Sequence, residues 1–536
     1  MASSSPAAVG TVYLVGAGPG DPGLLTVRGR QLLDRCDAIV YDALVPASLL
    51  AREERTGTAP PELHFVGKRG GDERSARQEE INALLVRLAR TGKQVVRLKG
   101  GDPLVFGRGS EEAQALAEHQ VPFEIVPGVT AGIAAPAYAG IPVTHRGLAT
   151  SVTFVTGHED PDKGETQTDW AALARATSSG GTLVLYMGVK RLPEIARALV
   201  QGGAPGEMPA AAIQWGTRPD QRTVVATLDT IAGRVSAEGL AAPVITVVGW
   251  PVVLREEIAW FDQRPLFGRR IAVTRAAQQA SALSERLREL GADVLEMPAT
   301  RIEPLDAAPL REALERFADY RLLVFTSQNA VALFWQQLLV SGRDARALAG
   351  KVVCAVGPAT AAALLDRGIT VDIVPERFVA EGILEALEAR PVVKGARVLY
   401  ATAEGSRDVL PEGLRAMGAT VDVVPIYRSV RDGQGADALR DALVRGEVDL
   451  VTFTSASGVQ GFVEAVGADA ARRARGASIG PVTSDAARAA GIEVAVEAPD
   501  ATIAALADAV AAALRDLPDE RWTADGVRAS ARSAGA

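Results

Sequence analysis

The chain is poor in the residues that build disulfide scaffolds, metal sites and membrane spans. Its 536 residues include only two cysteines, Cys36 and Cys354, and four scattered histidines. Two cysteines exclude a disulfide-rich scaffold, and no cysteine or histidine spacing is typical of a metal site. The longest apolar run, 241–254, is broken by glycine and proline and is shorter than the roughly 20 residues of a membrane helix. The first ten residues lack the charged and apolar regions of a secretory signal, so we expect a cytoplasmic protein without a bound metal.

Positive charge is also scarce, because 57 lysines and arginines face 65 aspartates and glutamates and the formal net charge is −8. This balance disfavours binding to nucleic acid or to a membrane surface by general electrostatic attraction. It does not exclude an acidic small-molecule substrate, because a site can be locally basic on an acidic protein. The hydrophobic share of 48% is typical of a globular chain. The length predicts three or four domains at about 150 residues each.

Short β-branched runs that end in glycine-rich turns alternate with stretches of helical spacing. Clear examples of such runs are 11–15, 94–98, 123–126 and 182–186. The alternation predicts an α/β fold with largely parallel sheets. In such sheets, ligands bind at the carboxyl ends of the strands, where the glycine turns lie.

The second half of the chain contains an internal repeat. GRRIAVTR at Gly268, LLVFTSQNAV around Phe325 and GPATAAALLDRGI at Gly357 each recur in outline about 125 residues later. The repeat predicts two similar α/β lobes. A short polar segment, 263–267, precedes this half and is typical of a linker, whereas 517–536 lack periodicity and are expected to form a flexible tail.

Four turns in the first half carry residue types suited to a small-molecule ligand. They are GAGPGDPGLLT with Pro19, KGGDPLV with Gly100, Gly101, Asp102 and Val105, VPGVTAG with Thr130 and Ala131, and YMG with Met187. Glycines let the backbone approach a ligand, and the Asp102 carboxylate can accept hydrogen bonds from ribose hydroxyls or an amino group. A structural interpretation stays open for each of them. The first motif is then only a tight strand–helix turn, Asp102 a turn or N-cap aspartate, and Met187 a core methionine. The first motif is not G-x-G-x-x-G, so no dinucleotide site is predicted.

These turns, together with VYDALV and VGKRGG, occur in one order over residues 12–260. In that order they resemble the S-adenosylmethionine-dependent uroporphyrinogen-III C-methyltransferases of the tetrapyrrole methylase family. The resemblance implies two α/β domains, S-adenosylmethionine as the methyl donor, and a homodimer. The cofactor contacts that it implies are Pro19, Gly100, Gly101, Asp102, Val105, Thr130, Ala131, Met187 and Gly216.

The same resemblance implies methylation of uroporphyrinogen III at C-2 and C-7 to precorrin-2, with Asp42 and Lys68 handling protons. Its substrate carries eight carboxylates, so cations beside the turns become candidate substrate contacts. These cations are Arg69, Lys99, Arg108 and Arg146. Solvated surface charges and structural ion pairs are the alternatives for all of them. Members of the family commonly have a histidine shortly after GKR, but Glu73 and Arg74 occupy that region here, which puts any role of that histidine in doubt.

The second half offers hydroxyls at its repeated turns and contains no histidine, so no Ser-His-Asp set is possible. FTSQNAV, PIYR, FTSASGV and IGPVTSDAA resemble uroporphyrinogen-III synthase over residues 268–514. That family implies two flavodoxin-like lobes and cyclisation of hydroxymethylbilane with loss of water and inversion of ring D. The residues carried over are Tyr427, which would help the hydroxyl leave, with Ser455 and Thr483 as further catalytic candidates and Ser327 as a substrate contact. N-capping for the hydroxyls and a buried hydrogen-bonded tyrosine are the alternatives.

The two resemblances together predict a bifunctional enzyme of tetrapyrrole biosynthesis. The predicted boundaries are a methyltransferase at 10–262, divided near 125–150, and a synthase at 268–516, with lobes formed by 268–300 plus 428–516 and by 301–427. The alternative is a methyltransferase of a later precorrin fused to a non-catalytic, tetrapyrrole-binding sensor module. Neither reading includes a nucleic-acid or membrane partner, and both sirohaem and cobalamin stay open as destinations.

Overall fold

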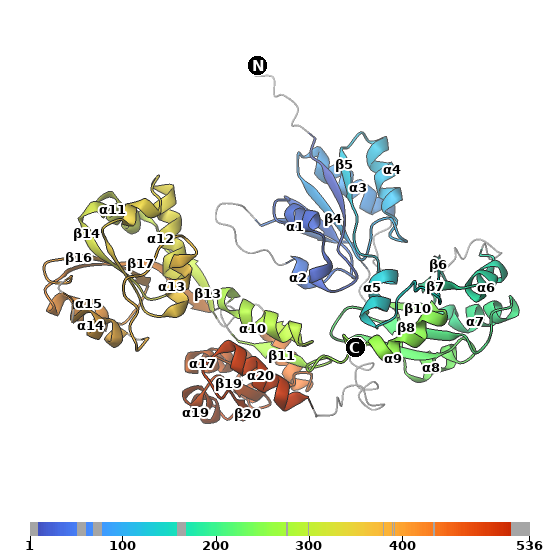
Figure 1. Cartoon of the computed structure of the whole chain (residues 1–536). Coiled ribbons are helices and arrows are strands. Elements are labelled where there is room, and N and C mark those ends of the chain that lie inside the picture. The colour runs from blue at the N-terminus through green and yellow to red at the C-terminus, as the bar shows by residue number, and fades with distance from the viewer. Residues whose placement is uncertain are drawn as a thin grey trace, which may run out of the picture. The chain divides into compact units, whose positions relative to one another are not determined.

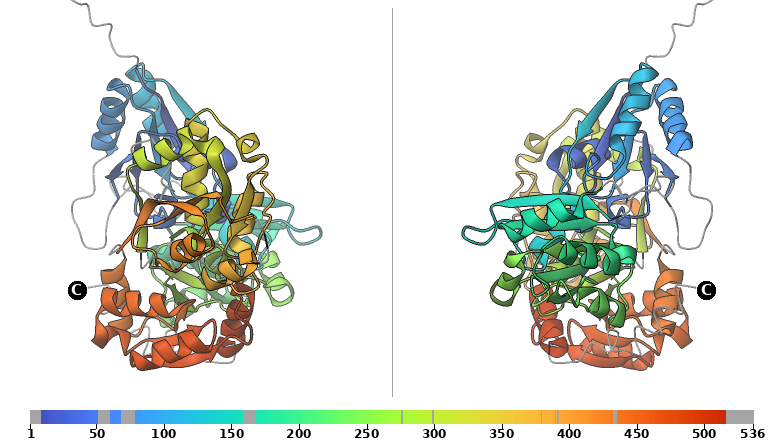
Figure 2. Two further views of the ribbon diagram at one scale, coloured as in Figure 1. Left: turned by 90° about the vertical axis from the view of Figure 1, so that its left-hand side faces the viewer. Right: turned by 90° about the vertical axis from the view of Figure 1, so that its right-hand side faces the viewer.

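The structure is a computed structural model. It describes residues 9–50, 60–67, 78–157, 168–274, 277–297, 300–378, 380–388, 390, 392–431 and 435–515. Lys68, Arg69 and the predicted tail lie outside these ranges. The chain divides into two compact units, the first formed by 1–271, 285–294 and 507–536 and the second by 272–284 and 295–506. The described strands form four five-stranded sheets with helices packed on them (Figure 1; Figure 2).

The first sheet has the strand order β3-β2-β4-β1-β5, and all of its pairings are parallel, as predicted. Its strands are β1 (Val12–Gly16), β2 (Ala38–Tyr41), β3 (Glu62–Phe65), β4 (Val95–Lys99) and β5 (Phe123–Val126). Its helices are α1 (Val27–Leu33), α2 (Ala47–Leu50), α3 (Gln78–Arg90) and α4 (Gly109–Glu118), with a 3-10 turn η1 (Pro22–Leu24). Because β4, β1 and β5 are neighbours, the glycine turns that follow them meet at one edge of this sheet.

The second sheet has the order β6-β7-β10-β8-β9 and is mixed. Its strands are β6 (Ser151–Thr156), β7 (Gly181–Tyr186), β8 (Pro209–Gln214), β9 (Arg222–Thr227) and β10 (Val244–Val248). The helices nearby in sequence are α5 (Ala131–Tyr138), α6 (Trp170–Ser178), α7 (Leu192–Gln201), α8 (Ile231–Ala237) and α9 (Arg255–Ile258), with η2 (Val189–Arg191) and η3 (Trp250–Leu254).

Only the β6–β7 pairing of this second sheet is parallel, while β10 is antiparallel to both of its neighbours and β8 to β9. The prediction of largely parallel sheets is therefore wrong for this sheet. For the β8–β9 pair the physical reason is the loop 215–221, which is too short for the helical crossover that parallel neighbours need.

The third sheet has the order β12-β11-β18-β19-β20, and the fourth has the order β13-β17-β16-β14-β15. The strands of the third are β11 (Arg270–Val273), β12 (Asp293–Glu296), β18 (Leu450–Phe453), β19 (Arg475–Ser478) and β20 (Glu493–Glu497). Those of the fourth are β13 (Thr300–Pro304), β14 (Tyr320–Phe325), β15 (Val352–Ala355), β16 (Arg397–Ala403) and β17 (Thr420–Arg431).

The helices of this half follow the strands in the same alternation. From α10 to α15 they are α10 (Ala277–Glu289), α11 (Ala308–Glu315), α12 (Gln328–Val340), α13 (Pro358–Leu365), α14 (Ala380–Glu388) and α15 (Val409–Ala416). From α16 to α20 they are α16 (Ala436–Val444), α17 (Ala456–Val466), α18 (Ala468–Ala471), α19 (Pro481–Ala489) and α20 (Ile503–Leu514), and the 3-10 turns are η4 (Phe317–Asp319) and η5 (Ala345–Leu348).

The internal repeat explains why these two sheets are alike. The third sheet runs 2-1-3-4-5 in chain order, which is the flavodoxin-like arrangement. The repeat pairs β11 with β16, β14 with β18 and β15 with β19, and the matching strands of the fourth sheet, β17-β16-β14-β15, follow the same order. Each sheet therefore combines strands from both copies of the repeat.

Among the described residues, no helix has both the length and the apolar character needed to cross a bilayer.

Candidate functional site

The turns after β1, β4 and β5 contact one another through their backbones. The amide of Gly101 donates to the carbonyl of Gly18 at 2.7 Å, and the amide of Gly18 donates to the carbonyl of Gly101 at 3.2 Å. A Cβ on Gly128 would lie 2.3 Å from the Gly101 carbonyl oxygen and 2.7 Å from the Cα of Gly16. No side chain fits between these turns, so glycine is required there for steric reasons.

Asp102 ties two of these turns together. Its Oδ1 accepts hydrogen bonds from the amides of Leu104 at 2.8 Å and Val105 at 3.2 Å, and its Oδ2 accepts one from the amide of Gly128 at 3.0 Å. This is the turn-aspartate interpretation that the sequence left open. The carboxylate holds the β4 turn against the β5 turn and so shapes the place where Gly100 and Gly101 lie.

Tyr186, at the end of β7, joins the second sheet to the start of α5. Its hydroxyl lies 2.7 Å from the Thr130 hydroxyl and accepts a 2.6 Å hydrogen bond from the Gly132 amide, while the Phe106 ring packs with its centroid 4.9 Å away. Burial raises the pKa of Tyr186, so the hydroxyl stays protonated. Tyr186 was not among the site residues predicted from the sequence, although it precedes Met187 in the YMG motif.

Left-handed backbone conformations are concentrated in turns that follow strands of the first and second sheets. Of the six described residues other than glycine that have a left-handed backbone, all but Gln120 follow β4, β7 or β8: Phe106, Arg108, Met187, Trp215 and Thr217. Each such conformation costs about 1–3 kcal/mol and persists only where the surroundings impose it, most often at ligand sites. Met187 is 53% exposed, so the interpretation as a core methionine is wrong.

The loop between β8 and β9 completes this region. The Thr217 hydroxyl accepts a 3.0 Å hydrogen bond from the amide of Asp21, and the Asp21 carboxylate accepts one of 2.7 Å from the hydroxyl of Tyr138, whose pKa is raised by burial. A Cβ on Gly216 would lie 2.3 Å from the Cβ of Ala135 on α5. The structure thus brings the GAGPGD turn, which contains Pro19, to the loop that contains Gly216.

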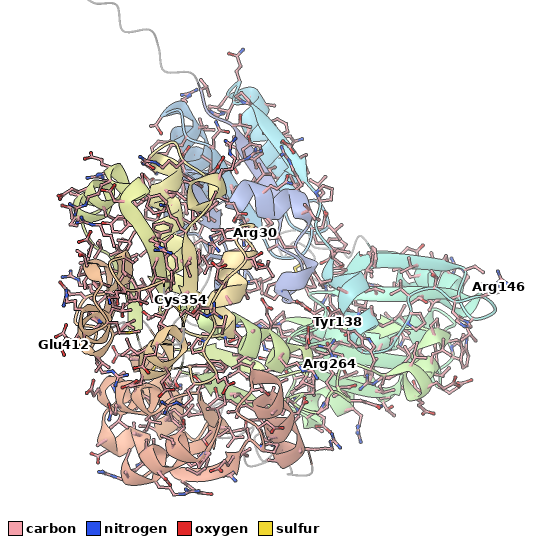
Figure 3. The ribbon with its side chains drawn as sticks, turned by 60° about the vertical axis from the view of Figure 1, so that its left-hand side comes forward. Arg30, Tyr138, Arg146, Arg264, Cys354 and Glu412 are labelled. Carbon is pink, nitrogen blue, oxygen red and sulfur yellow. The ribbon has the colours of Figure 1, made fainter. Side chains whose placement is uncertain are left out.

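The predicted substrate cations have different environments. Lys99 is buried and donates to the Glu112 carboxylate at 2.9 Å, so it fits a structural ion pair better than a substrate contact. Arg108 is exposed and pairs with Glu111 at 2.7 Å. Arg146 is exposed, and Figure 3 shows it at the outer end of its loop, away from Tyr138. Lys68, Arg69 and the departure at Glu73 and Arg74 lie outside the described residues.

Asp42 directly follows β2. Its Oδ1 accepts a 3.1 Å hydrogen bond from the amide of Leu44, and its Oδ2 lies 3.9 Å from the Arg97 guanidinium. The side chain is 26% exposed, so the carboxylate of this residue, which is predicted to handle protons, is open to solvent on one side and faces a buried cation on the other.

In the second half, the fourth sheet brings two predicted residues together. The Tyr427 hydroxyl lies 2.9 Å from the Ser327 hydroxyl, which also accepts a 3.0 Å hydrogen bond from the Ala330 amide as the N-cap of α12. Burial raises the pKa of Tyr427. The N-cap interpretation of Ser327 is correct, and the N-cap hydrogen bond holds the Ser327 hydroxyl beside Tyr427.

The other two predicted residues belong to helices that follow strands of the third sheet. Ser455 is the N-cap of α17 and accepts a 3.1 Å hydrogen bond from the Gly458 amide. Thr483 is buried in the first turn of α19. Ser327 and Ser455 occupy equivalent positions of the repeat, and both cap the helix after a β-strand that ends in phenylalanine and is followed by Thr-Ser.

Comparison with known proteins separates the chain into two families. Residues 11–232 match the tetrapyrrole (corrin/porphyrin) methylases, and residues 281–508 match uroporphyrinogen-III synthase HemD. The chain is 38% identical to the porphyrin biosynthesis protein HemD of Ruminiclostridium josui, over 85% of this chain and 88% of that protein.

Two further relatives match the first half. The S-adenosyl-L-methionine-dependent uroporphyrinogen III methyltransferase of Methanosarcina barkeri is 51% identical over 46% of this chain and 94% of its own length. The siroheme synthase of Methylobacillus flagellatus is 49% identical over 48% of this chain and 53% of its own length. The chain therefore belongs to the tetrapyrrole methylases through its first half and to the uroporphyrinogen-III synthases through its second half, as a fusion of the two families.

Proposed function

We propose that the chain performs two consecutive reactions of tetrapyrrole biosynthesis. The second half cyclises hydroxymethylbilane to uroporphyrinogen III with loss of water and inversion of ring D. The first half methylates that product at C-2 and C-7 to precorrin-2. The observation that carries the proposal for the first half is the close packing of three glycine turns at the edge of the first sheet, which Asp21 and Thr130 link to the turns that follow β8 and β7 of the second sheet.

The residues at this edge fit S-adenosylmethionine. The glycine turns leave backbone groups accessible at close range, and the exposed Met187 offers an apolar, polarisable contact. We propose that Gly100, Gly101, Val105, Ala131 and Gly216 contact the cofactor and that Asp102, Thr130 and Pro19 shape its site. The bound cofactor would supply an electrophilic methyl group on a sulfonium sulfur. Tyr186 would hold the Thr130–Gly132 turn in place for it.

The remaining work of the first half is to bind the macrocycle and to remove a proton from it. In the proposal, a pyrrole carbon forms the new bond to the methyl group while the bond between that methyl group and the sulfonium sulfur breaks, so S-adenosylhomocysteine leaves. A proton then leaves the methylated macrocycle. Asp42 accepts that proton, with Lys68 as its partner in proton handling. Arg69, Arg108 and Arg146 receive substrate carboxylates, because a guanidinium binds a carboxylate through two parallel hydrogen bonds.

In the second half, we propose that Tyr427 donates a hydrogen bond to the departing hydroxyl of hydroxymethylbilane. Its contact with Ser327 orients the phenol, and its raised pKa keeps the proton available. Ser455 and Thr483 serve as further polar contacts for the bilane. The departing hydroxyl takes up a proton and leaves as water, which gives a cationic intermediate, and ring closure at a pyrrole carbon releases a proton again, so no strong base is required of this half.

The proposal extends to assembly and setting. We propose a homodimer through the methyltransferase half, with precorrin-2 passing on to sirohaem or cobalamin. A cytoplasmic location is supported by Cys36 and Cys354, which are buried and form no disulfide, because disulfides are rare in that compartment. The proposed boundaries are 10–262, 263–267, 268–516 and 517–536, supported by the whole sheets that the first and third of these ranges contain.

The experiment is incubation of the full chain with hydroxymethylbilane, with and without S-adenosylmethionine. We expect uroporphyrinogen III without the cofactor and precorrin-2 with it, resolved by chromatography and mass. Formation of only the type I ring, at the uncatalysed rate, would contradict the synthase half and favour a binding module. Failure to methylate authentic uroporphyrinogen III, with methylation of a later precorrin instead, would contradict the methyltransferase half.

Tyr186→Phe is expected to weaken binding of S-adenosylhomocysteine at least tenfold and to leave cyclisation unchanged. The change removes the acceptor of the Gly132 amide and the partner of Thr130, and an unsatisfied buried donor costs about 1–3 kcal/mol. Calorimetric titration measures the affinity. Tyr13→Phe is the matched control, because its hydroxyl bonds Gln94 on the same half, outside the turns. Equal affinities of the two variants would contradict the role of Tyr186.

Tyr427→Phe is expected to lower kcat for cyclisation at least about tenfold, since general acid assistance contributes 10²–10⁴-fold in typical cases. Methylation of supplied uroporphyrinogen III should not change. Tyr320→Phe, which removes a hydroxyl bonded to Asp422 at the beginning of β14, serves as the control for a lost tyrosine hydrogen bond in the same sheet. A Tyr427→Phe enzyme with the rate of Tyr320→Phe would show that Tyr427 only packs.

A further inference from the structure

Two cations are buried on β4, the middle strand of the first sheet. Arg97 is 3% exposed and Lys99 is 4% exposed. Residues two apart on a strand face the same side, so both charges project toward the same layer of helices. An unpaired buried charge is strongly unfavourable, and two like charges at one place need more than one partner.

Glu112, on α4, is the first partner, and it is 0% exposed. Its Oε1 accepts hydrogen bonds from Arg97 Nε at 3.1 Å and from Lys99 Nζ at 2.9 Å, with the Gln78 amide nitrogen at 3.4 Å. Its Oε2 is buried and has no hydrogen bond in the structure. Burial, aided by the charge of Arg97, lowers the pKa of Lys99. One carboxylate between two cations leaves one positive charge uncompensated.

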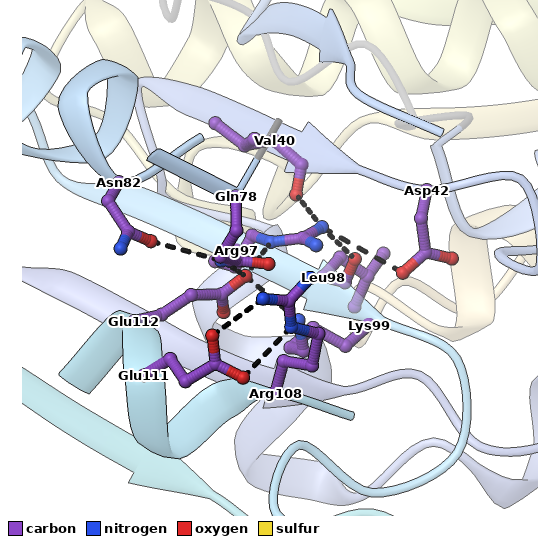
Figure 4. A network of polar contacts seen from close by, with 10 residues as sticks. All are labelled: Val40, Asp42, Gln78, Asn82, Arg97, Leu98, Lys99, Arg108, Glu111 and Glu112. Carbon is purple, nitrogen blue, oxygen red and sulfur yellow. Dashed lines mark hydrogen bonds and ion pairs between the residues drawn. The ribbon is translucent and has the colours of Figure 1, made fainter. Parts of the chain in front are cut away.

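The second partner is Asp42. Arg97 Nη1 donates to the carbonyls of Val40 at 3.4 Å and Leu98 at 3.2 Å, and the same nitrogen lies 3.9 Å from Asp42 Oδ2 (Figure 4). Two cations and two carboxylates then balance. Of these four groups, only Asp42 is appreciably exposed, so the buried network ends at the carboxylate that we propose as proton acceptor.

We infer that Glu112 is a positioning residue for Asp42, which it orients through the guanidinium of Arg97. This inference rests on the proposed function, in which Asp42 takes the proton that leaves the macrocycle. Glu112 holds Nε of Arg97, so that Nη1 is fixed against the end of β2 and beside Asp42. The charged groups of this network in the described residues are Arg97 and Lys99 on β4 and Glu112 on α4. Arg108 and Glu111, which pair with each other, lie close enough to interact electrostatically with Glu112 and Lys99.

Two single variants test the inference through opposite changes in charge. Glu112→Gln removes a negative charge, so the cations act more strongly on Asp42, and the acidic limb of the kcat/KM profile for methylation should move to lower pH. Lys99→Met removes a positive charge, and the limb should move to higher pH. We expect kcat to fall at least about tenfold in Glu112→Gln, because small displacements of a catalytic group have large effects. Affinity for S-adenosylhomocysteine should stay within threefold of wild type in both.

Glu118→Gln is the matched control, because it makes the same chemical change at an exposed position of α4. If Glu112→Gln does not fold, the upward shift in Lys99→Met carries the test. If the wild type is active and both variants keep its pH profile, the inference is overturned. The network then only stabilises α4 on the sheet. A wild type that transfers no methyl group would instead contradict the proposed function.

Discussion

Gly128→Ala is expected to abolish methyl transfer while cyclisation continues at the wild-type rate. The added Cβ would lie 2.3 Å from the Gly101 carbonyl oxygen and 2.7 Å from the Gly16 Cα, and all of these atoms are backbone. Overpacking of this kind costs about 1–3 kcal/mol or more, and here no flexible side chain can move aside to relieve it. The turns must separate, which breaks the bond from the Gly128 amide to Asp102 and displaces the proposed cofactor contacts.

The measurement is initial rates of both reactions on one preparation, with calorimetric titration of S-adenosylhomocysteine. Gly233→Ala is the control, since its added Cβ has no neighbour within 4 Å and it lies inside α8. An alanine there should stabilise the helix by roughly 0.5–1 kcal/mol and leave both rates unchanged. If Gly128→Ala binds S-adenosylhomocysteine as wild type does, the cofactor does not occupy the glycine turns.

The site residues that could be predicted from the sequence are those whose role depends on local geometry. The turns at Gly16, Gly101 and Gly128 are visible as glycines at or just after the ends of predicted strands, and the parallel order of the first sheet brings them together. The repeat likewise predicted two similar lobes, because segments that resemble one another form equivalent strands and helices. Ser327 and Ser455 could be recognised as N-caps from the hydroxyl before each helical stretch.

The residues whose role was predicted wrongly or missed depend on partners that are distant in the sequence. Lys99 looked like a substrate cation beside a glycine turn, but its burial against Glu112 is decided by how α4 packs on β4. Tyr186 was missed because its partners, Thr130 and Gly132, are more than 50 positions away in the chain. The left-handed backbone of Trp215 has no local signal at all, since tryptophan rarely adopts it without tertiary constraint.

Phe334→Ala is expected to have the opposite effect to Gly128→Ala on the two activities, with loss of cyclisation at 37 °C and retention of methylation. Phe334 is fully buried on α12, where its ring centroid lies 5.1 Å from that of Phe325 and 5.9 Å from that of Phe317. Removing a buried phenylalanine ring costs about 3–5 kcal/mol, a large part of the 5–15 kcal/mol that stabilises a typical domain. The same helix begins at Ser327, so a displaced α12 also loses the contact between Ser327 and Tyr427.

Thermal unfolding with both rates as probes checks this expectation. The transition that removes cyclisation should fall by at least about 6 °C, given roughly 2–4 °C per kcal/mol for a unit of 150–250 residues. Leu339→Ala, on the same helix but half exposed, should change either rate by less than twofold, because an exposed substitution is usually worth no more than about 0.5 kcal/mol. If Phe334→Ala also removed methylation, the two activities would depend on one cooperative unit. Retained methylation would instead mean that each half of the fusion supports its own reaction.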